Sequence, residues 1–120
     1  SVLFGLVHII GMGFNILSCA LVLLAGTMVG IMFSLIASET KSIWNSAIVH
    51  VLWNIIIIGG ILWIGTEFDE YSLLSYVLEA KSFLLTGGEF GIESSIIAVI
   101  GYGLVCLLVV LPNKKKGENA

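Results

Sequence analysis

Charge is what this sequence has least of. Of its 120 residues 11% are charged and 58% are hydrophobic, whereas a soluble globular domain is about 25% charged and about 45–50% apolar. No Asp, Glu, Lys or Arg occurs within residues 2–37, 43–66 or 94–113. Each of these runs reaches the roughly 20 residues that a helix needs to cross a bilayer. The composition therefore excludes an ordinary soluble domain and predicts an integral membrane protein.

Cysteines and basic residues are also scarce, and this limits the function classes that the sequence allows. The two cysteines, Cys19 and Cys106, lie inside apolar runs and form no CxxC pair, which is typical of packing residues. The chain starts at Ser1 without the basic region that opens a signal peptide, so we expect the full protein to begin further upstream. The net charge of −3, with one short basic tail, does not favour a nucleic-acid partner.

Turn-forming and capping residues divide the apolar runs into helices. Gly and Asn residues within 11–15 predict a break in the first run. A polar loop follows at residues 38–42, where Ser42 is a candidate N-cap and the Thr40 hydroxyl a second one. Pro112 is expected to end the last helix. The predicted membrane helices cover residues 2–10, 16–38, 43–65 and 92–111.

A polar stripe marks a fifth predicted helix over residues 69–86. Its members recur at spacings of three and four, at Ser72, Ser75, Glu79, Ser82 and Thr86. This period indicates an amphipathic helix lying in the membrane interface. The predicted fold is thus an all-α, polytopic transmembrane bundle of about four membrane helices plus one interfacial helix.

Three lysines at residues 114–116 follow the last apolar run directly. Basic residues beside a span favour the cytoplasmic side. We therefore expect a cytoplasmic C-terminus, an external acidic segment over residues 66–91, and a location in a bacterial plasma membrane.

Three polar side chains interrupt the apolar helices: His8, His50 and Asn54. His50 and Asn54 are four residues apart, so they share one face of a helix. If residues 1 and 42 mark the cytoplasmic ends of their helices, His8 and His50 both lie roughly 11–12 Å deep. We expect these residues to form one functional site. The alternative is that each hydrogen-bonds across to a neighbouring helix and serves only packing.

The same residues resemble a known family. Phe4 and His8 stand in an FxxxH motif, and His50 and Asn54 in an HxxxN motif about forty residues later. Both are similar to motifs of the CPBP family, the CAAX-prenyl-protease and bacteriocin-processing intramembrane proteases. The resemblance covers residues 3–58 and includes the small residues Gly26 and Gly30 between the motifs, which we read as a packing pair.

One family motif, Glu-Glu-xxx-Arg, is absent from these 120 residues. We expect it on an upstream helix, so that the chain is the C-terminal portion of a single integral-membrane protease domain. On its own this portion is expected to be inactive.

The resemblance implies hydrolysis of a peptide bond by glutamate-activated water, with His8, His50 and Asn54 as catalytic residues. His8 would bind the water, and His50 and Asn54 would face the oxyanion. Phe4 is expected to line the substrate pocket. No cofactor is expected; a zinc site using His8 and His50 is a second choice, because catalytic zinc usually needs three protein ligands and we expect no inward carboxylate in this chain.

The substrate would be a prenylated protein, a leader peptide or a membrane-anchored protein, with membrane lipid around it. The sequence does not indicate an oligomeric state. A non-enzymatic immunity or scaffolding protein of the same fold is the alternative. A transporter subunit with His8 and His50 in a proton path is a third reading.

Overall fold

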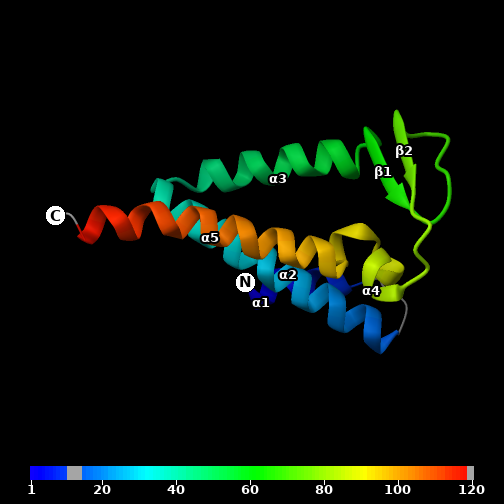
Figure 1. The fold of residues 1–120 in the computed structure, drawn as a ribbon, viewed down its shortest axis with the longest axis horizontal. Coiled ribbons are helices and arrows are strands. Elements are labelled where there is room, and N and C mark those ends of the chain that lie inside the picture. Colours follow the sequence, from blue (N-terminus) through cyan, green and yellow to red (C-terminus); the bar gives the residue numbers. More distant parts are fainter. Residues whose placement is uncertain (11–14, 119–120) are drawn as a thin grey trace.

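The computed structural model describes residues 1–10 and 15–118, without the side chains of residues 89 and 112–118. The described part is mostly helical, as predicted, with one small sheet beyond the end of one helix (Figure 1). The α-helices are α1 (Val2–Ile9), α2 (Ile16–Thr40), α3 (Ile43–Ile57), α4 (Phe83–Thr86) and α5 (Ile96–Glu118). The other elements are strands β1 (Leu62–Gly65) and β2 (Leu74–Val77) and the 3₁₀ turns η1 (Gly88–Phe90) and η2 (Ile92–Ser94).

Helices α1 and α2 pack backbone to backbone. A Cβ atom on Gly26 would lie 2.5 Å from the Cα atom of Gly5, and one on Gly30 would lie 2.6 Å from that of Ser1. Only glycine allows this approach. The interpretation of Gly26 and Gly30 as a packing pair is therefore confirmed, and the contact fixes α1 on the face of α2.

The core lies on α2, between α1 and α5. Its buried apolar side chains are Leu21, Val22, Ala25 and Met32. Helix α3 has no buried residue and diverges from α5 toward the sheet (Figure 1). Near its start, the Ser46 hydroxyl donates a hydrogen bond to the carbonyl oxygen of Phe33 on α2 (2.8 Å). The molecule is thus a packed group of three helices with α3 as a separate arm.

Side-chain caps set where α2 and α3 begin. The Asn15 carboxamide oxygen accepts from the backbone N–H groups of Leu17 and Ser18 (3.0 and 3.1 Å), so the predicted start of the second helix is confirmed. The Ser42 hydroxyl accepts from the N–H of Trp44 (3.3 Å), as predicted. The second candidate, Thr40, was wrong: its hydroxyl donates within α2, to the Ile36 carbonyl (2.7 Å). Residues 11–14 of the predicted break lie outside the described residues.

The predicted helix over 43–65 was too long. Helix α3 ends at Ile57, and Gly60 takes a positive φ of 77° before β1 begins. Fifteen residues give α3 a length of about 22 Å. Among the described residues α2 alone is long and apolar enough to cross a membrane, while Ile43–Ile57 and Ile96–Leu111 are shorter apolar helices.

The predicted interfacial helix over 69–86 was wrong. This segment contains β2, paired in parallel with β1, and only the short helix α4. Two serines of the polar stripe bond locally to Asp69: the Ser72 hydroxyl donates to its carboxylate, and the Ser75 hydroxyl accepts from its N–H. Such bonds compete with helix formation. These two polar residues therefore stabilise a turn and do not form one face of a helix.

The expectation that Pro112 ends the last helix was also wrong. Helix α5 continues to Glu118. Proline removes one backbone hydrogen bond and kinks or breaks a helix, but apolar helices of membrane proteins tolerate it where the freed groups are satisfied again. The loss of a single bond does not end α5.

Candidate active site

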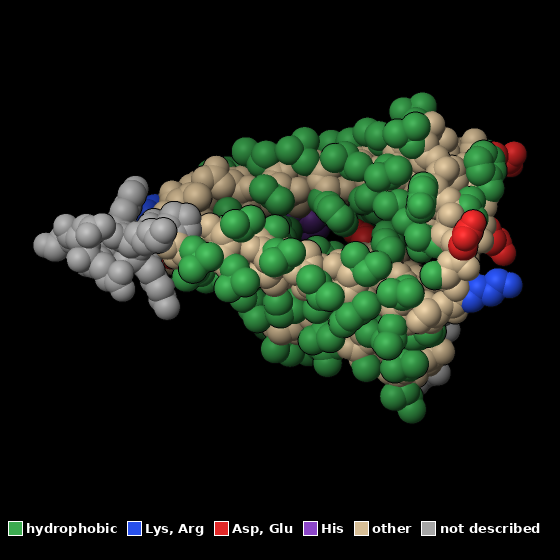
Figure 2. Space-filling view, viewed as in Figure 1, with side chains coloured by type: hydrophobic (Ala, Val, Ile, Leu, Met, Phe, Trp, Pro, Cys, Tyr) green, Lys and Arg blue, Asp and Glu red, His purple; other side chains and the backbone are tan. Residues whose placement is uncertain are grey.

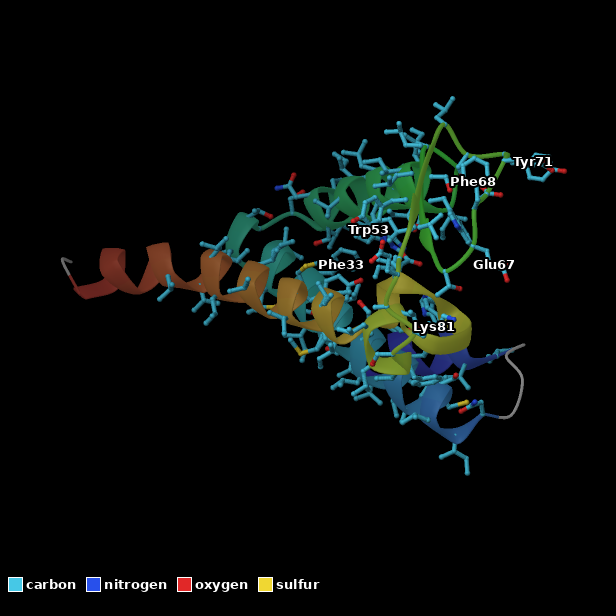
Figure 3. The ribbon with its side chains drawn as sticks, turned by 45° about the vertical axis from the view of Figure 1, so that its right-hand side comes forward. Phe33, Trp53, Glu67, Phe68, Tyr71 and Lys81 are labelled. Atoms are coloured by element: carbon cyan, nitrogen blue, oxygen red, sulfur yellow. The ribbon has the colours of Figure 1, made fainter. Side chains whose placement is uncertain are left out.

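A cavity of about 510 Å³ lies between α2, α3 and α5, with α1 at its edge. All four residues that the sequence singled out line it: Phe4, His8, His50 and Asn54. Figure 2 shows a histidine and an acidic side chain inside the hollow between the two arms of the molecule. In Figure 3, Phe33 from α2 and Trp53 from α3 point into the space between their helices. The motif residues thus share one cavity.

Phe4 is the link between the two histidines. Its ring centroid lies 4.6 Å from that of His8 and 5.7 Å from that of His50. Phe33 lies 5.2 Å from the ring of His50 and 6.0 Å from that of Phe4, edge-on. These contacts restrict how each imidazole can turn, and they place both histidines against the same aromatic wall.

The hydrogen bond of His8 fixes its tautomer. Its Nδ1 atom lies 2.6 Å from the carbonyl oxygen of Phe4, one helical turn earlier. A carbonyl oxygen can only accept, so Nδ1 carries a proton. In the neutral ring Nε2 is then the unprotonated nitrogen. His8 can accept a hydrogen bond from a water molecule at that atom.

His50 and Asn54 keep their side-chain hydrogen-bonding groups unused within the described part of the chain. Both are half-buried and one helical turn apart on α3, and both line the cavity. An imidazole offers one N–H donor when neutral, and a carboxamide offers two. Helix α3 thus presents at least two donor groups to whatever occupies the cavity.

The sequence analysis missed a carboxylate in this cavity. Glu93, in η2, lines it and accepts a hydrogen bond from the indole N–H of Trp53. The expectation that this chain holds no inward carboxylate was therefore wrong. Phe90 also lines the cavity, with its ring 6.0 Å from that of His8. Glu93 directly precedes an uncharged run. The sequence pattern therefore does not distinguish it from a charged residue at the edge of a membrane span.

A glycine-rich turn holds Glu93 in place. Gly87 and Gly91 take φ angles of 82° and 91°, and a Cβ atom on Gly87 would lie 1.7 Å from the Gly91 carbonyl oxygen. The fully buried Ser94 donates to the Gly87 carbonyl (2.6 Å). The Tyr102 hydroxyl of α5 donates to the backbone carbonyl of Glu93 (3.0 Å). Since α5 and the turn are joined in this way, the position of Glu93 is set by the packed helices.

Metal ligation has no ready set of ligands in the described residues. Within 1–10 and 15–118, no three His, Cys, Asp or Glu side chains are grouped so that they could hold a metal ion. The zinc alternative would therefore need at least one further ligand, because His8, His50 and Glu93 do not form such a group among the described residues.

The family comparison agrees with the motifs that line the cavity. Residues 1–56 match the model of the family described as type II CAAX prenyl endopeptidase Rce1-like. This part of the chain is an Rce1-like CAAX prenyl endopeptidase domain of the CPBP family. No curated protein and no solved structure matches the chain significantly.

The family matched by residues 1–56 indicates a coarse function for this part of the chain. The family is membrane-embedded, and its members are proteases that act on peptide substrates. The match ends at residue 56, so it includes α1, α2 and most of α3 but not the segment that carries Glu93. The cavity is therefore built partly by the family domain and partly by the residues after it.

Proposed function

We propose that this chain supplies the histidine half of an intramembrane endopeptidase that hydrolyses a peptide bond with carboxylate-activated water. The observation that carries the proposal is the convergence of His8, His50 and Asn54 on one cavity. His8 binds the attacking water at Nε2. His50 and Asn54 donate hydrogen bonds to the oxyanion that forms when water adds to the peptide carbonyl. Phe4 lines the pocket beside the scissile bond.

The chemistry of the donors supports these roles. Donors that are already aimed at a developing oxyanion in a dry site contribute about 3–4 kcal/mol each. Apolar and aromatic side chains form most of the cavity wall, and a low local dielectric strengthens such hydrogen bonds. His50 and Asn54 share one rigid helix, so binding an oxyanion needs no rearrangement of the backbone.

The base of this reaction is a glutamate in related enzymes, on the Glu-Glu-xxx-Arg motif that these 120 residues do not contain. The proposed chain is accordingly one portion of a single integral-membrane protease domain. Its substrates would be prenylated proteins, leader peptides or membrane-anchored proteins.

The test is cleavage of a farnesylated CAAX-type peptide and of an unmodified leader peptide by the full-length protein in lipid vesicles. His50→Ala should lower kcat by at least 100-fold, as expected for loss of one oxyanion donor, roughly 10²–10³-fold. His8→Ala should have a similar effect, because it removes the group that binds the attacking water. Asn54→Ala should have a similar effect. Asn45→Ala is the matched control, because Asn45 is exposed on the same helix and does not line the cavity.

Other outcomes separate the alternatives. If wild-type and both histidine variants show the same biological activity without any cleavage, the non-enzymatic immunity or scaffolding role is favoured and the protease proposal fails. Metal analysis of the purified full-length protein tests zinc. Stoichiometric zinc that activity requires would overturn the carboxylate mechanism.

A further inference from the structure

We propose that an exposed apolar surface on β2 and on the loop before it anchors this end of the molecule in the headgroup–acyl boundary of the bilayer. The surface, called the apolar patch below, consists of Phe68, Tyr71, Leu73, Leu74 and Tyr76. The proposal depends on the membrane location of the family and not on the peptidase mechanism. It concerns residues beyond the family match, which ends at residue 56.

The five side chains of the apolar patch are 63–87% exposed. Tyr71 is the most exposed of them, and in Figure 3 it points away from the rest of the molecule. Single exposed apolar residues are normal on a protein surface, whereas several large ones on one short segment mark a surface that contacts something other than water. The segment therefore requires an apolar or amphipathic partner.

The polar side chains of the same segment lie on its inner side. Asp69, Ser72 and Ser75 are half-buried. The Ser72 hydroxyl donates to the Asp69 carboxylate, and the Ser75 hydroxyl accepts from the Asp69 N–H (3.1 Å). A loop in water has the opposite arrangement, with polar groups outside and apolar groups inside. Polar groups that bond to one another inside are expected where the surroundings offer few partners.

The length of α3 brings this segment to the membrane boundary. Helix α3 follows the charged loop that holds Glu39 and Lys41, and its 15 residues rise about 22 Å. The hydrocarbon core is about 30 Å thick, and any tilt shortens the depth that the helix spans. The end of α3 at Ile57 therefore lies about 8 Å short of the far boundary (30 − 22). Residues 58–66 carry no charge, so the chain can complete the crossing before the apolar patch begins.

The charges around the apolar patch fit the boundary and not the centre of the bilayer. The exposed residues Glu67, Glu70, Glu79 and Lys81 flank it, and Figure 2 shows acidic side chains and a lysine at this end of the molecule. Charged groups are costly in the acyl core, whereas a tyrosine ring at the boundary can keep its hydroxyl among the headgroups.

The sign of the charge indicates which force holds the segment. Residues 66–81 contain four acidic side chains and one lysine, so anionic headgroups would repel the segment. The attraction is therefore the burial of apolar surface, and it should operate equally well with zwitterionic lipid.

The test attaches an environment-sensitive fluorophore to one cysteine of the full-length protein in phosphatidylcholine vesicles, with all other cysteines replaced. At Leu73→Cys the emission should shift to shorter wavelength. A nitroxide on the acyl chain near the headgroup should quench this label more than one near the chain end, and iodide in the water should quench it least. Phosphatidylglycerol, an anionic lipid, should not increase the quenching by nitroxide.

Glu79→Cys is the matched control. Glu79 is exposed on the same segment but outside the apolar patch, so iodide should quench a label there more than either nitroxide does. Replacing two rings of the patch, by Phe68→Ser together with Tyr71→Ser, should weaken nitroxide quenching at residue 73 and strengthen iodide quenching. Glu79→Gln should change neither.

Three results would overturn the proposal. If iodide quenches the label at residue 73 as strongly as the label at residue 79, the apolar patch faces water. If neither iodide nor the nitroxides quench it, another part of the full-length protein or a second copy covers the patch. If quenching by nitroxide appears only with phosphatidylglycerol, headgroup charge and not apolar burial holds the segment. None of these measurements depends on cleavage, so they are independent of the proposed peptidase function.

Discussion

The contact between Gly5 and Gly26 makes a sharp test of how α1 positions the site. In Gly26→Ala the added Cβ atom would lie 2.5 Å from the Cα atom of Gly5. Ordinary contact begins at 3.4 Å, so α1 must move by about 0.9 Å (3.4 − 2.5). This movement would displace His8, because His8 lies on the same short helix and lines the cavity.

The expected changes in stability and in rate show that the cleavage rate will respond more than the unfolding temperature. Overpacking costs about 1–3 kcal/mol, but alanine is favoured over glycine in a helix by about 0.8–1.0 kcal/mol. The net loss of stability is therefore about 0–2 kcal/mol. A displacement of about 1 Å can cost roughly 10²-fold in rate. We expect kcat of the full-length protein to fall about 100-fold while its unfolding temperature changes by a few degrees.

Gly103→Ala is the matched control. It lies on α5, and its added Cβ atom would meet only the end of the Met28 side chain, at 3.8 Å. This variant gains helix propensity without a clash, so cleavage should stay at the wild-type rate and stability should rise by up to about 1 kcal/mol. Wild-type cleavage by Gly26→Ala in the same assay would refute the idea that the α1–α2 contact positions His8.

Three further predictions concern other parts of the chain. Gly87→Ala should lower both cleavage and the unfolding temperature, because its Cβ atom would lie 1.7 Å from a carbonyl oxygen at a φ of 82°; unchanged kinetics would contradict this. Ser42→Ala should cost about 1 kcal/mol in thermal unfolding through loss of the cap of α3, and Ser42→Asn should restore it. Reporter fusions should place residue 116 in the cytoplasm and residues 66–91 outside, and a cytoplasmic 66–91 segment would reverse the proposed orientation.

The motif residues could be placed from the sequence because helical spacing decides their faces. His50 and Asn54 share a face of α3 wherever that helix ends, so the error in its predicted length did not matter. Ser42 could be predicted as a cap, and Asn15 as part of the break before the second helix, because each bonds to residues within three positions of itself. These are local interactions, and a sequence pattern records them directly.

Glu93 and the strands depended on contacts that no local pattern records. Glu93 meets Trp53, forty residues earlier in the chain, and it stands in a 3₁₀ turn without helical period. The stripe that included Ser72 and Ser75 had a helical period by coincidence, because both side chains close a turn at Asp69. Spacing alone cannot distinguish a polar helix face from serines that bond to a nearby residue of a turn.

Helix α3 carries two residues of the proposed site and yet buries none of its own side chains. The packed helices hold it near its first turn, through Ser46 and Phe33, and again through Trp53 and Glu93. Most of its surface must therefore be covered by something other than the described residues, and in a membrane that includes acyl chains. The distance between the two histidines would then depend on the surrounding bilayer as well as on the polypeptide. Cleavage rates should therefore be compared only in the same lipid.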